Sequence, residues 1–346
     1  MHIRLRLFII AVTIVATSFS SCEYDQLPDP LNSITRRVPT LEINYTTPPI
    51  SGLSTGDERV RYRYAEDLAY SDAHRRNALD IFTLTTREPS PLVIYIHSGG
   101  FISGDKAQAY DFSQDIRSFL TQGIAFATIN YRFLEESENG VMTCLEDIRR
   151  AVQFLRYHAK EFNIDPNRVS CYGVSAGAGA SLWLATHEDM ADIRSNDPVE
   201  RQSTRIRSAV AIGAQASYDL VTWEDIFEVH GFRLDDPNND QQSLFDFYNI
   251  SSVEELYTPE MTAYRKKIDM LGLFSADDAP VYVMNNGTSA PPTNNGELYH
   301  HPFHAAAVKE AAEKAGVENQ IYALDIGVSD PKGESPLEFT VRHLKE

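Results

Sequence analysis

A serine flanked by two glycines, Gly173-Val174-Ser175-Ala176-Gly177, stands where an apolar run, residues 169–174, meets a helix-forming run. A serine on such a tight strand-to-helix turn is typical of a nucleophile elbow. The small flanking residues avoid clashes, and the helix N-terminus favours the anion that develops during attack. The pentapeptide alone also occurs by chance, so its position between strand and helix is what makes it informative. We therefore predict that Ser175 is a nucleophile.

A second glycine-rich segment lies upstream at the end of another apolar run and reads Ile96-His97-Ser98-Gly99-Gly100-Phe101. Small residues there allow backbone N–H groups to point into a cavity. The amides of Gly99, Gly100 and Ala176 are the predicted oxyanion hole. We expect His97 to be a structural hydrogen-bonding residue rather than a base.

The wider pattern predicts an α/β fold, because short apolar runs alternate with longer amphipathic stretches. A dinucleotide-binding loop is disfavoured because Gly173, Gly177 and Gly179 do not fit G-x-G-x-x-G. Predicted strands cover residues 79–84, 92–97, 124–130, 169–174, 209–213, 281–285 and 321–325, and predicted helices cover residues 111–122, 142–162, 176–187, 303–315 and 337–345.

From residue 78 to the C-terminus the chain resembles an α/β-hydrolase of the bacterial hormone-sensitive-lipase and feruloyl-esterase-like groups. The motifs that carry the resemblance are the elbow, the glycine-rich segment, Leu79-Asp80-Ile81-Phe82, Gly104-Asp105-Lys106, Asn130-Tyr131-Arg132 and the run from Asn163 to Val169. The resemblance implies a mostly parallel central sheet flanked by helices, with an insertion or lid at residues 214–279 before the penultimate strand. It also implies a serine carboxylic-ester hydrolase that needs no cofactor or metal. Such an enzyme acts through an acyl-enzyme on small acyl or aryl esters, possibly carbohydrate-linked.

The acid and the base of that family are not at their usual positions. The loop after residue 285 has no carboxylate at the expected place, and the loop after residue 325 has no histidine before His343, which we expect to face solvent. A displaced base is one hypothesis: His301 or His300 reaches Ser175, oriented by Glu297. The competing interpretation is that these histidines shape a loop and a helix cap. Zinc binding by His300 and His304 is a weaker alternative.

A different class of function therefore stays open. If the acid and base are lost, the chain is a catalytically degenerate binding protein that retains the elbow and the pocket. The aromatic residues of the insertion form either a binding wall or a satellite core.

Composition limits the partners. The chain has 346 residues, of which 42% are hydrophobic, so it is long and apolar enough for a sizeable core. Its formal net charge of −18 has the wrong sign for nucleic-acid binding. The resemblance implies a small-molecule ester as the partner. The oligomeric state does not follow from the sequence.

The N-terminus reads as an export signal over residues 1–21, in which arginines precede a short apolar run and small residues. Cys22 follows, as in a bacterial lipoprotein signal, and is the predicted lipidation site; a plain secretory signal is the alternative. Residues 22–57 read as a tether and residues 58–346 as the hydrolase domain. We thus expect an exported protein, held at a membrane only by its lipid anchor, in the periplasm or on the cell surface. Cys144 and Cys171 are expected to be buried free thiols.

Overall fold

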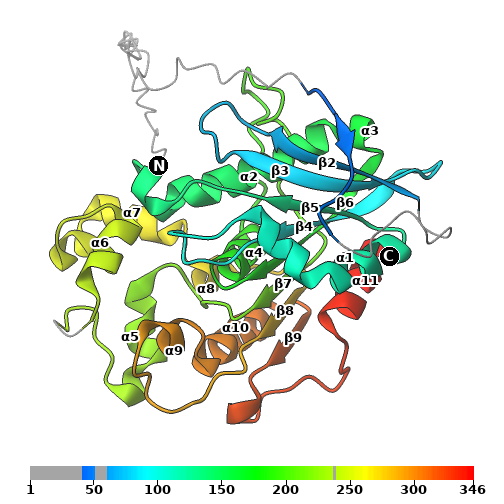
Figure 1. The fold of residues 1–346 in the computed structure, drawn as a ribbon. Helices are drawn as coiled ribbons and strands as arrows, with labels where there is room; N and C mark the ends of the chain where they lie inside the picture. Colours follow the sequence, from blue (N-terminus) through cyan, green and yellow to red (C-terminus); the bar gives the residue numbers. More distant parts are fainter. Residues whose placement is uncertain (1–40, 51–60, 237–238) are drawn as a thin grey trace, which may run out of the picture. The chain divides into compact units, whose positions relative to one another are not determined.

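The computed structural model describes residues 41–50, 61–236 and 239–346. A nine-stranded sheet with the order β1-β2-β3-β5-β4-β6-β7-β8-β9 forms its centre (Figure 1). The strands are β1 (Tyr45–Thr46), β2 (Tyr62–Ala69), β3 (Ala78–Leu84), β4 (Ser90–Ile96), β5 (Ala125–Ile129), β6 (Ile164–Val174), β7 (Ala209–Ile212), β8 (Val281–Met284) and β9 (Asn319–Tyr322).

From β5 to β9 all neighbouring strands pair in parallel, whereas β1, β2 and β3 are antiparallel to their neighbours. The carboxyl ends of the parallel strands therefore meet at one edge of the sheet. In open α/β sheets this edge is where ligands bind. The predicted fold class, a mostly parallel α/β-hydrolase sheet, is confirmed.

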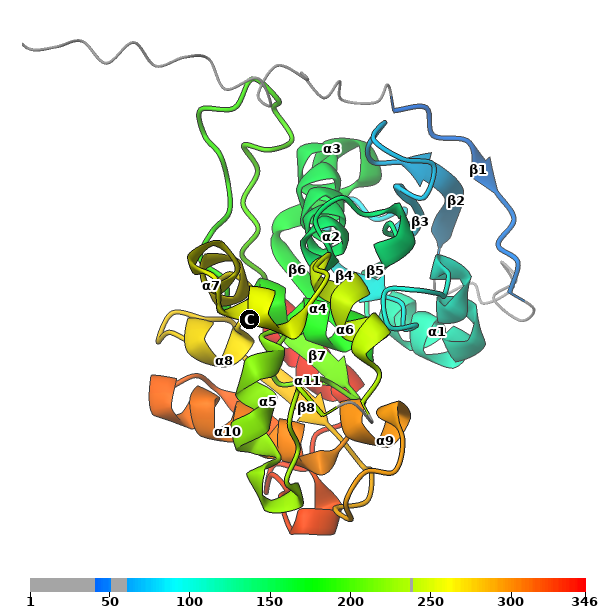
Figure 2. The same cartoon turned by 90° about the vertical axis from the view of Figure 1, so that its left-hand side faces the viewer.

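Helices cover both faces of the sheet (Figure 2). One apolar cluster packs α2, α4 and α10 against the sheet, and a second packs α1 and α11 against it. The helices are α1 (Ser113–Thr121), α2 (Val141–Tyr157), α3 (Ala159–Phe162), α4 (Ala176–Thr186), α5 (Trp223–Ile226), α6 (Gln241–Tyr248), α7 (Pro259–Lys266), α8 (Met270–Leu273), α9 (Asn295–Tyr299), α10 (Pro302–Ala315) and α11 (Pro336–Lys345).

All seven predicted strands are present, and the structure adds β1 and β2. β1 lies within residues 22–57, the predicted tether, so that this part of the segment belongs to the sheet. Of the predicted tether, the structure describes only residues 41–50, which include β1. The export signal and Cys22 lie outside the described residues. The helix predicted over residues 142–162 is divided at His158, which ends α2 and precedes α3.

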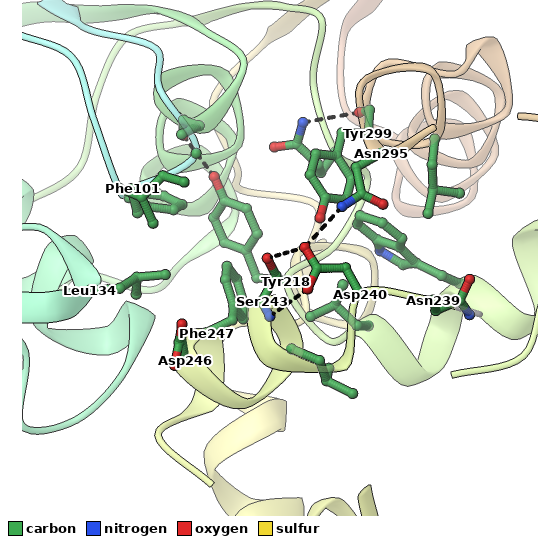
Figure 3. A pocket seen from close by; sticks show the side chains of 18 of the residues that line it. Phe101, Leu134, Tyr218, Asn239, Asp240, Ser243, Asp246, Phe247, Asn295 and Tyr299 are labelled. Atoms are coloured by element: carbon green, nitrogen blue, oxygen red, sulfur yellow. Dashed lines mark hydrogen bonds between the residues drawn. The ribbon is translucent and has the colours of Figure 1, made fainter. Parts of the chain in front are cut away.

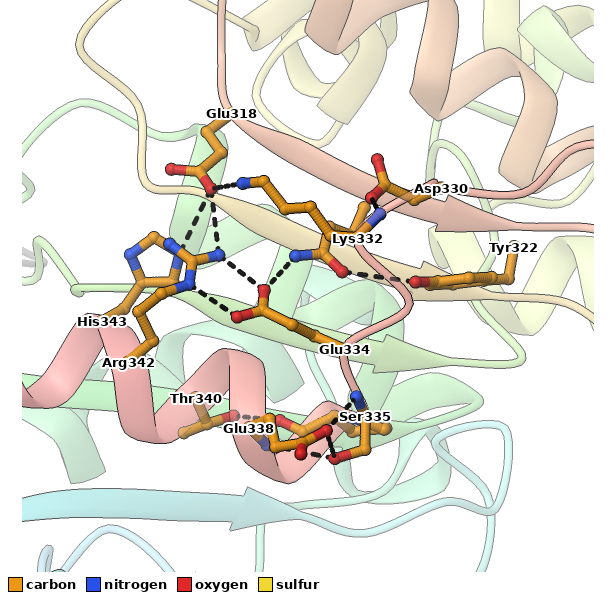
Figure 4. A network of polar contacts seen from close by, with 12 residues as sticks. Glu318, Tyr322, Asp330, Lys332, Glu334, Ser335, Glu338, Thr340, Arg342 and His343 are labelled. Carbon is orange, nitrogen blue, oxygen red and sulfur yellow. Dashed lines mark hydrogen bonds and ion pairs between the residues drawn. The ribbon is translucent and has the colours of Figure 1, made fainter.

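The last helix, α11, is fixed to the sheet by ionic contacts (Figure 4). Arg342 donates to Glu334 at 2.8 Å and to Glu318 at 3.0 Å. The expectation that His343 faces solvent is wrong: its side chain is 7% exposed and lies beside the ring of Phe339. His343 lies on the side of α11 that packs against the sheet, so its side chain is buried together with the apolar residues of that side.

Cys144 and Cys171 are both buried and free, as predicted. Burial raises the pKa of the Cys144 thiol, so it stays protonated at neutral pH. None of the helices in the described part of the chain is long and apolar enough to cross a membrane.

Candidate active site

Ser175 lies at the turn between β6 and α4, with φ +54° and ψ −115°. Positive φ is uncommon for a residue with a side chain and marks a strained position. The turn is held by the Ser175 amide, which donates to the Ile212 carbonyl at 2.8 Å. The serine is partly exposed and lines a cavity. The predicted elbow geometry is therefore present.

The two elbow glycines are explained by close backbone approach. A Cβ on Gly173 would lie 1.9 Å from the Gly177 carbonyl oxygen, and a Cβ on Gly177 would lie 2.0 Å from the Ile96 carbonyl oxygen. Real Cβ atoms do not approach other atoms so closely. Only glycine lets the start of α4 rest against the end of β4.

A histidine contacts the serine. The Oγ atom of Ser175 is 2.8 Å from Nε2 of His300. His300 directly follows α9, in the connection between β8 and β9. In the family that the chain resembles, the connection after this strand carries the acid of the triad, and the base follows the last strand. A histidine at the serine hydroxyl that comes from this connection is therefore unusual.

The end of β7 makes room for His300. Gly213 follows β7 with φ +65°, and a Cβ built on it would lie 3.3 Å from Cδ2 of the His300 ring. The Gln215 side chain donates to the Tyr299 carbonyl at 3.0 Å, one residue before His300. His300 thus lies against the backbone of Gly213, and the residue before it is held by the Gln215 side chain.

The His300 ring is kept neutral. Burial lowers its pKa from the usual 6.5, and a hydrogen bond with the backbone of Gly296 partly offsets this effect. No carboxylate among the described residues contacts its ring. A neutral imidazole can accept a proton from the serine, but the imidazolium that results has no anionic partner.

The structure corrects the predicted base. His301 is 1% exposed, and its Nε2 lies 3.2 Å from the Ala290 carbonyl oxygen. Its Nδ1 accepts a hydrogen bond from the Phe303 amide at 3.2 Å, so the ring caps the N-terminus of α10. The capping interpretation is therefore correct for His301, and of the two histidines considered, His300 is the one at Ser175. The signal was present in the sequence, because a residue directly before Pro302 occupies the cap position.

Glu297 does not orient either histidine. Its carboxylate accepts from the Thr293 amide at 2.7 Å and from the Thr293 hydroxyl at 2.8 Å. These bonds lower its pKa and direct the side chain to the solvent-exposed start of α9. Helix α9 therefore directs the Glu297 side chain toward Thr293, away from His300, which follows the helix.

His304 is fully buried and both its ring nitrogens are engaged. Nδ1 accepts from the Ala216 amide at 3.3 Å, and Nε2 donates to the Leu298 carbonyl at 3.1 Å. Burial lowers its pKa to about 3. Among the described residues no group of three His, Cys, Asp or Glu side chains is arranged to hold a metal ion.

Two of the three predicted oxyanion donors border the same cavity as Ser175. Gly100 and Ala176 line it, and Ala176 opens α4, where the first amides have no intrahelical partner. Gly99 is not among the described lining residues. Its carbonyl accepts from the Ile102 and Ser103 amides, and a Cβ on it would meet the Ser103 carbonyl oxygen at 2.1 Å. Gly99 thus shapes the turn that presents Gly100.

His97 has the structural role that we predicted. It is fully buried, stacks on Tyr131 with ring centroids 4.2 Å apart, and its Nδ1 lies 2.7 Å from the Ser98 carbonyl oxygen. Burial lowers its pKa to about 4, so the ring stays neutral.

The family's usual acid and base positions carry other groups. Asn285, directly after β8, is 1% exposed and donates to the Ala214 and His301 carbonyls. Asp325, after β9, accepts from the Ser289 amide at 2.6 Å. Both side chains tie loops together and neither is bonded to His300.

The insertion forms most of the cavity wall. The cavity has a volume of about 220 Å³, and Figure 3 shows the aromatic and polar side chains around it. The lining residues supplied by the insertion are Gln215, Tyr218, Leu220, Trp223, Phe232, Leu234, Asn239, Asp240, Gln241, Ser243, Leu244, Asp246 and Phe247. These residues line the cavity, and three of them, Tyr218, Leu234 and Leu244, also belong to the main buried apolar cluster, so the insertion has features of both interpretations.

A serine on an elbow, a histidine at its hydroxyl and a neighbouring amide pair on this sheet define an α/β-hydrolase. The chain belongs to the BD-FAE family, whose model matches residues 79–264.

Similar proteins agree with this family. The chain is 36% identical over 109 residues to fumonisin B1 esterase of Sphingopyxis macrogoltabida, covering 28% of this chain and 20% of that protein. It is 27% identical over 168 residues to the probable carboxylic ester hydrolase LipM of Mycobacterium tuberculosis, covering 47% of this chain and 37% of that protein. The chain thus spans only a fifth to about a third of the length of such curated relatives.

Among solved structures, a truncated carbohydrate esterase from gut microbiota aligns with a TM-score of 0.62 at 15% identity, over 84% of this chain and 99% of that one. An esterase B from Lactobacillus rhamnosis aligns with a TM-score of 0.52 at 17% identity, over 78% of this chain and 79% of that one. At these identities the likeness concerns the fold.

Proposed function

We propose that the protein is a serine carboxylic-ester hydrolase that acts through an acyl-enzyme. The contact of 2.8 Å between Ser175 Oγ and His300 Nε2 is the observation that carries the proposal. The curated relatives named esterases support the reaction class. The apolar cavity, lined in part by aromatic rings, suits small acyl or aryl esters, including esters linked to a carbohydrate.

In the proposed reaction Ser175 Oγ attacks the ester carbonyl carbon while its proton passes to Nε2 of His300. The carbonyl oxygen becomes an oxyanion that accepts hydrogen bonds from the Gly100 and Ala176 amides. The tetrahedral intermediate collapses, the C–O bond to the alcohol breaks, and His300 returns the proton to the leaving alkoxide. Water then attacks the acyl-serine by the same steps, which releases the acid and frees Ser175.

A fluorophosphonate probe tests the proposal, because it reacts covalently with activated serines. We expect stoichiometric labelling that maps to the peptide with Ser175 and disappears in Ser175→Ala. Labelling should be much slower in His300→Ala. Failure of the intact protein to react, or labelling that maps to another serine, would contradict the proposal.

A second candidate function is favoured by one observation, the lack of a carboxylate at His300 among the described residues. A degenerate hydrolase that binds a ligand without turnover would have this feature. Two measurements distinguish the candidates. The binding protein would not react with the fluorophosphonate probe, and it would hydrolyse p-nitrophenyl acetate no faster than Ser175→Ala does.

We also propose that the protein is exported and carries a lipid on Cys22. The basis is the pattern of residues 1–22, which lie outside the described residues. Cells grown with labelled palmitate should yield labelled protein, and Cys22→Ser should yield none. A Cys22→Ser protein that keeps its label would refute this site.

A further inference from the structure

The cavity beside Ser175 is lined by carboxylates without a compensating cation. Asp240 and Asp246 both line it, whereas none of its described lining residues is lysine, arginine or histidine. The chain as a whole has a net charge of −18, so the long-range field has the same sign. A negatively charged substrate would therefore be repelled on approach and again in the cavity.

Both carboxylates are exposed, and Asp240 accepts more hydrogen bonds than Asp246, whose carboxylate is bonded by Gln242. Asp240 precedes α6 and accepts from the Ser243 amide at 3.1 Å and from the Ser243 hydroxyl at 2.6 Å. The Asn295 amide group, on α9, reaches the same carboxylate at 3.3 Å (Figure 3). These bonds lower the pKa of Asp240 and keep it ionised at neutral pH. All its partners are neutral, so they fix the carboxylate without cancelling its charge.

The remaining wall offers little to an anion. The rings of Trp223 and Tyr299 lie 5.9 Å apart, and those of Tyr218 and Phe247 lie 5.7 Å apart. Aromatic ring faces carry partial negative charge, so they attract cations and apolar groups. The carboxylates and the rings thus favour the same kinds of ligand.

We propose that Asp240 is a specificity-determining residue that makes this cavity select neutral and cationic esters and reject anionic ones. The inference rests on the proposed function, because it takes this cavity as the binding site of the ester's alcohol part.

The test compares three acetate esters of similar size whose alcohols differ in charge: choline (cationic), 3,3-dimethylbutanol (neutral) and 2-hydroxyethanesulfonate (anionic). In the intact protein kcat/KM should be lowest for the anionic ester. In Asp240→Asn the ratio of kcat/KM for the cationic ester to that for the anionic ester should fall roughly 10-fold, as expected for losing one partly screened charge nearby. Asparagine keeps the size and caps a helix as well as aspartate does, but its amide nitrogen cannot accept from Asn295. Loss of that bond alone would affect all three esters alike, so a structural role would not change this ratio.

Asp225→Asn is the matched control, because Asp225 is an exposed carboxylate on α5 of the same insertion and is not a described lining residue. It should leave the ratio unchanged. An equal fall in both variants, or no fall in Asp240→Asn, would overturn the inference. Raising the salt concentration should also reduce the ratio in the intact protein.

Failure of the proposed function is distinguishable. If none of the esters is hydrolysed, binding of the three parent alcohols is measured by calorimetry. A preference for choline over 2-hydroxyethanesulfonate that is lost in Asp240→Asn would support the charge selectivity of a binding pocket. Equal affinity for the three alcohols, or no detectable binding of any, would overturn it.

Discussion

Positive backbone φ values cluster around the proposed chemistry. Ser175 has φ +54°, and three consecutive residues of the facing turn, Gly99, Gly100 and Phe101, also have positive φ. Glycine adopts such conformations freely, but at Ser175 and Phe101 they cost free energy and persist only where the surrounding structure enforces them. Here the strain holds the serine hydroxyl above the sheet edge and turns the glycine segment toward the same cavity.

The role of each histidine can be separated by substitution. His300→Ala should lower kcat for p-nitrophenyl acetate by about 100-fold to 10,000-fold, as for loss of a general base. His301→Asn should retain activity, because asparagine can cap α10 as the His301 ring does. A larger loss in His301→Asn than in His300→Ala would show that His301, and not His300, acts as the base.

Substitution of Glu297 tests whether this carboxylate acts in catalysis. Because its carboxylate is bonded to Thr293 and to no described histidine, Glu297→Gln should leave kcat/KM within about 2-fold of the intact protein, which is below the effect of losing a catalytic group. Steady-state kinetics with the same ester measures this. A fall comparable to that of His300→Ala would show that Glu297 acts in catalysis.

The pH profile should report the environment of His300. Burial lowers the pKa of its ring from the usual 6.5, so the neutral, proton-accepting form persists to lower pH. The acid limb of kcat/KM should therefore have its midpoint below 6.5. A midpoint above that value would indicate an anion near the ring and contradict the arrangement described above.

At the scale of elements, the site depends on how closely α4 approaches β4. Gly177→Ala should lower the free energy of unfolding by about 1–3 kcal/mol or more, because overpacking moves backbone rather than a flexible side chain. Urea denaturation measures the change. Gly316→Ala is the control, since a Cβ there meets nothing within 4 Å and only its φ of +78° is strained. A smaller loss in Gly177→Ala than in Gly316→Ala would contradict the close approach.

The connection from β8 to β9 is the second element that defines the site. Pro302 starts α10 and makes His301 its cap. His300 is then left between α9 and the cap, next to Gly213. The short helix α9 ahead of α10 thus brings a histidine to Ser175 from the connection before the last strand.

At the scale of the whole molecule, the contacts of α11 predict a pH dependence of folding. The Arg342 guanidinium, with help from Gln320, lowers the pKa of Glu334 from 4.5 to about 2. A carboxyl group with a depressed folded-state pKa stabilises the fold above its unfolded pKa. Its contribution is therefore present above pH 4.5 and is lost as pH falls toward 2.

Arg342→Met should thus be destabilised at pH 6 and approach the intact protein at pH 3, as measured by thermal unfolding at both values. Lys160→Met, which removes an exposed cation of α3, should show no such convergence. A difference between Arg342→Met and the intact protein that is equal at both pH values would show that the ion pair is not its cause.

The insertion is the part of the molecule that we expect to determine substrate specificity. Residues 214–279 follow β7 and include the helices α5 to α8, and they supply most of the cavity wall. The proposed catalytic pair, Ser175 and His300, lies at the carboxyl edge of the parallel strands, whereas most of the cavity wall comes from the insertion, whose described residues form no strand. Reaction and selectivity can therefore change independently in this fold.

The sequence by itself determined the fold and the position of the elbow serine, because both depend on local patterns. Alternating apolar runs fix the order of strands and helices, and glycines two residues either side of Ser175 are required by backbone approach at the turn. The amides of Gly100 and Ala176 follow from the same short segments. The two N-terminal strands escaped notice, since β1 has only two residues and β2 carries polar side chains at several positions.

Only the tertiary structure decided which histidine meets the serine and which groups line the cavity. Ser175 and His300 are 125 positions apart, and adjacent histidines point in different directions because one caps a helix and the other precedes the cap. Side-chain direction in a loop depends on the elements that the loop joins, so spacing along the chain could not distinguish His300 from His301 or exclude Glu297.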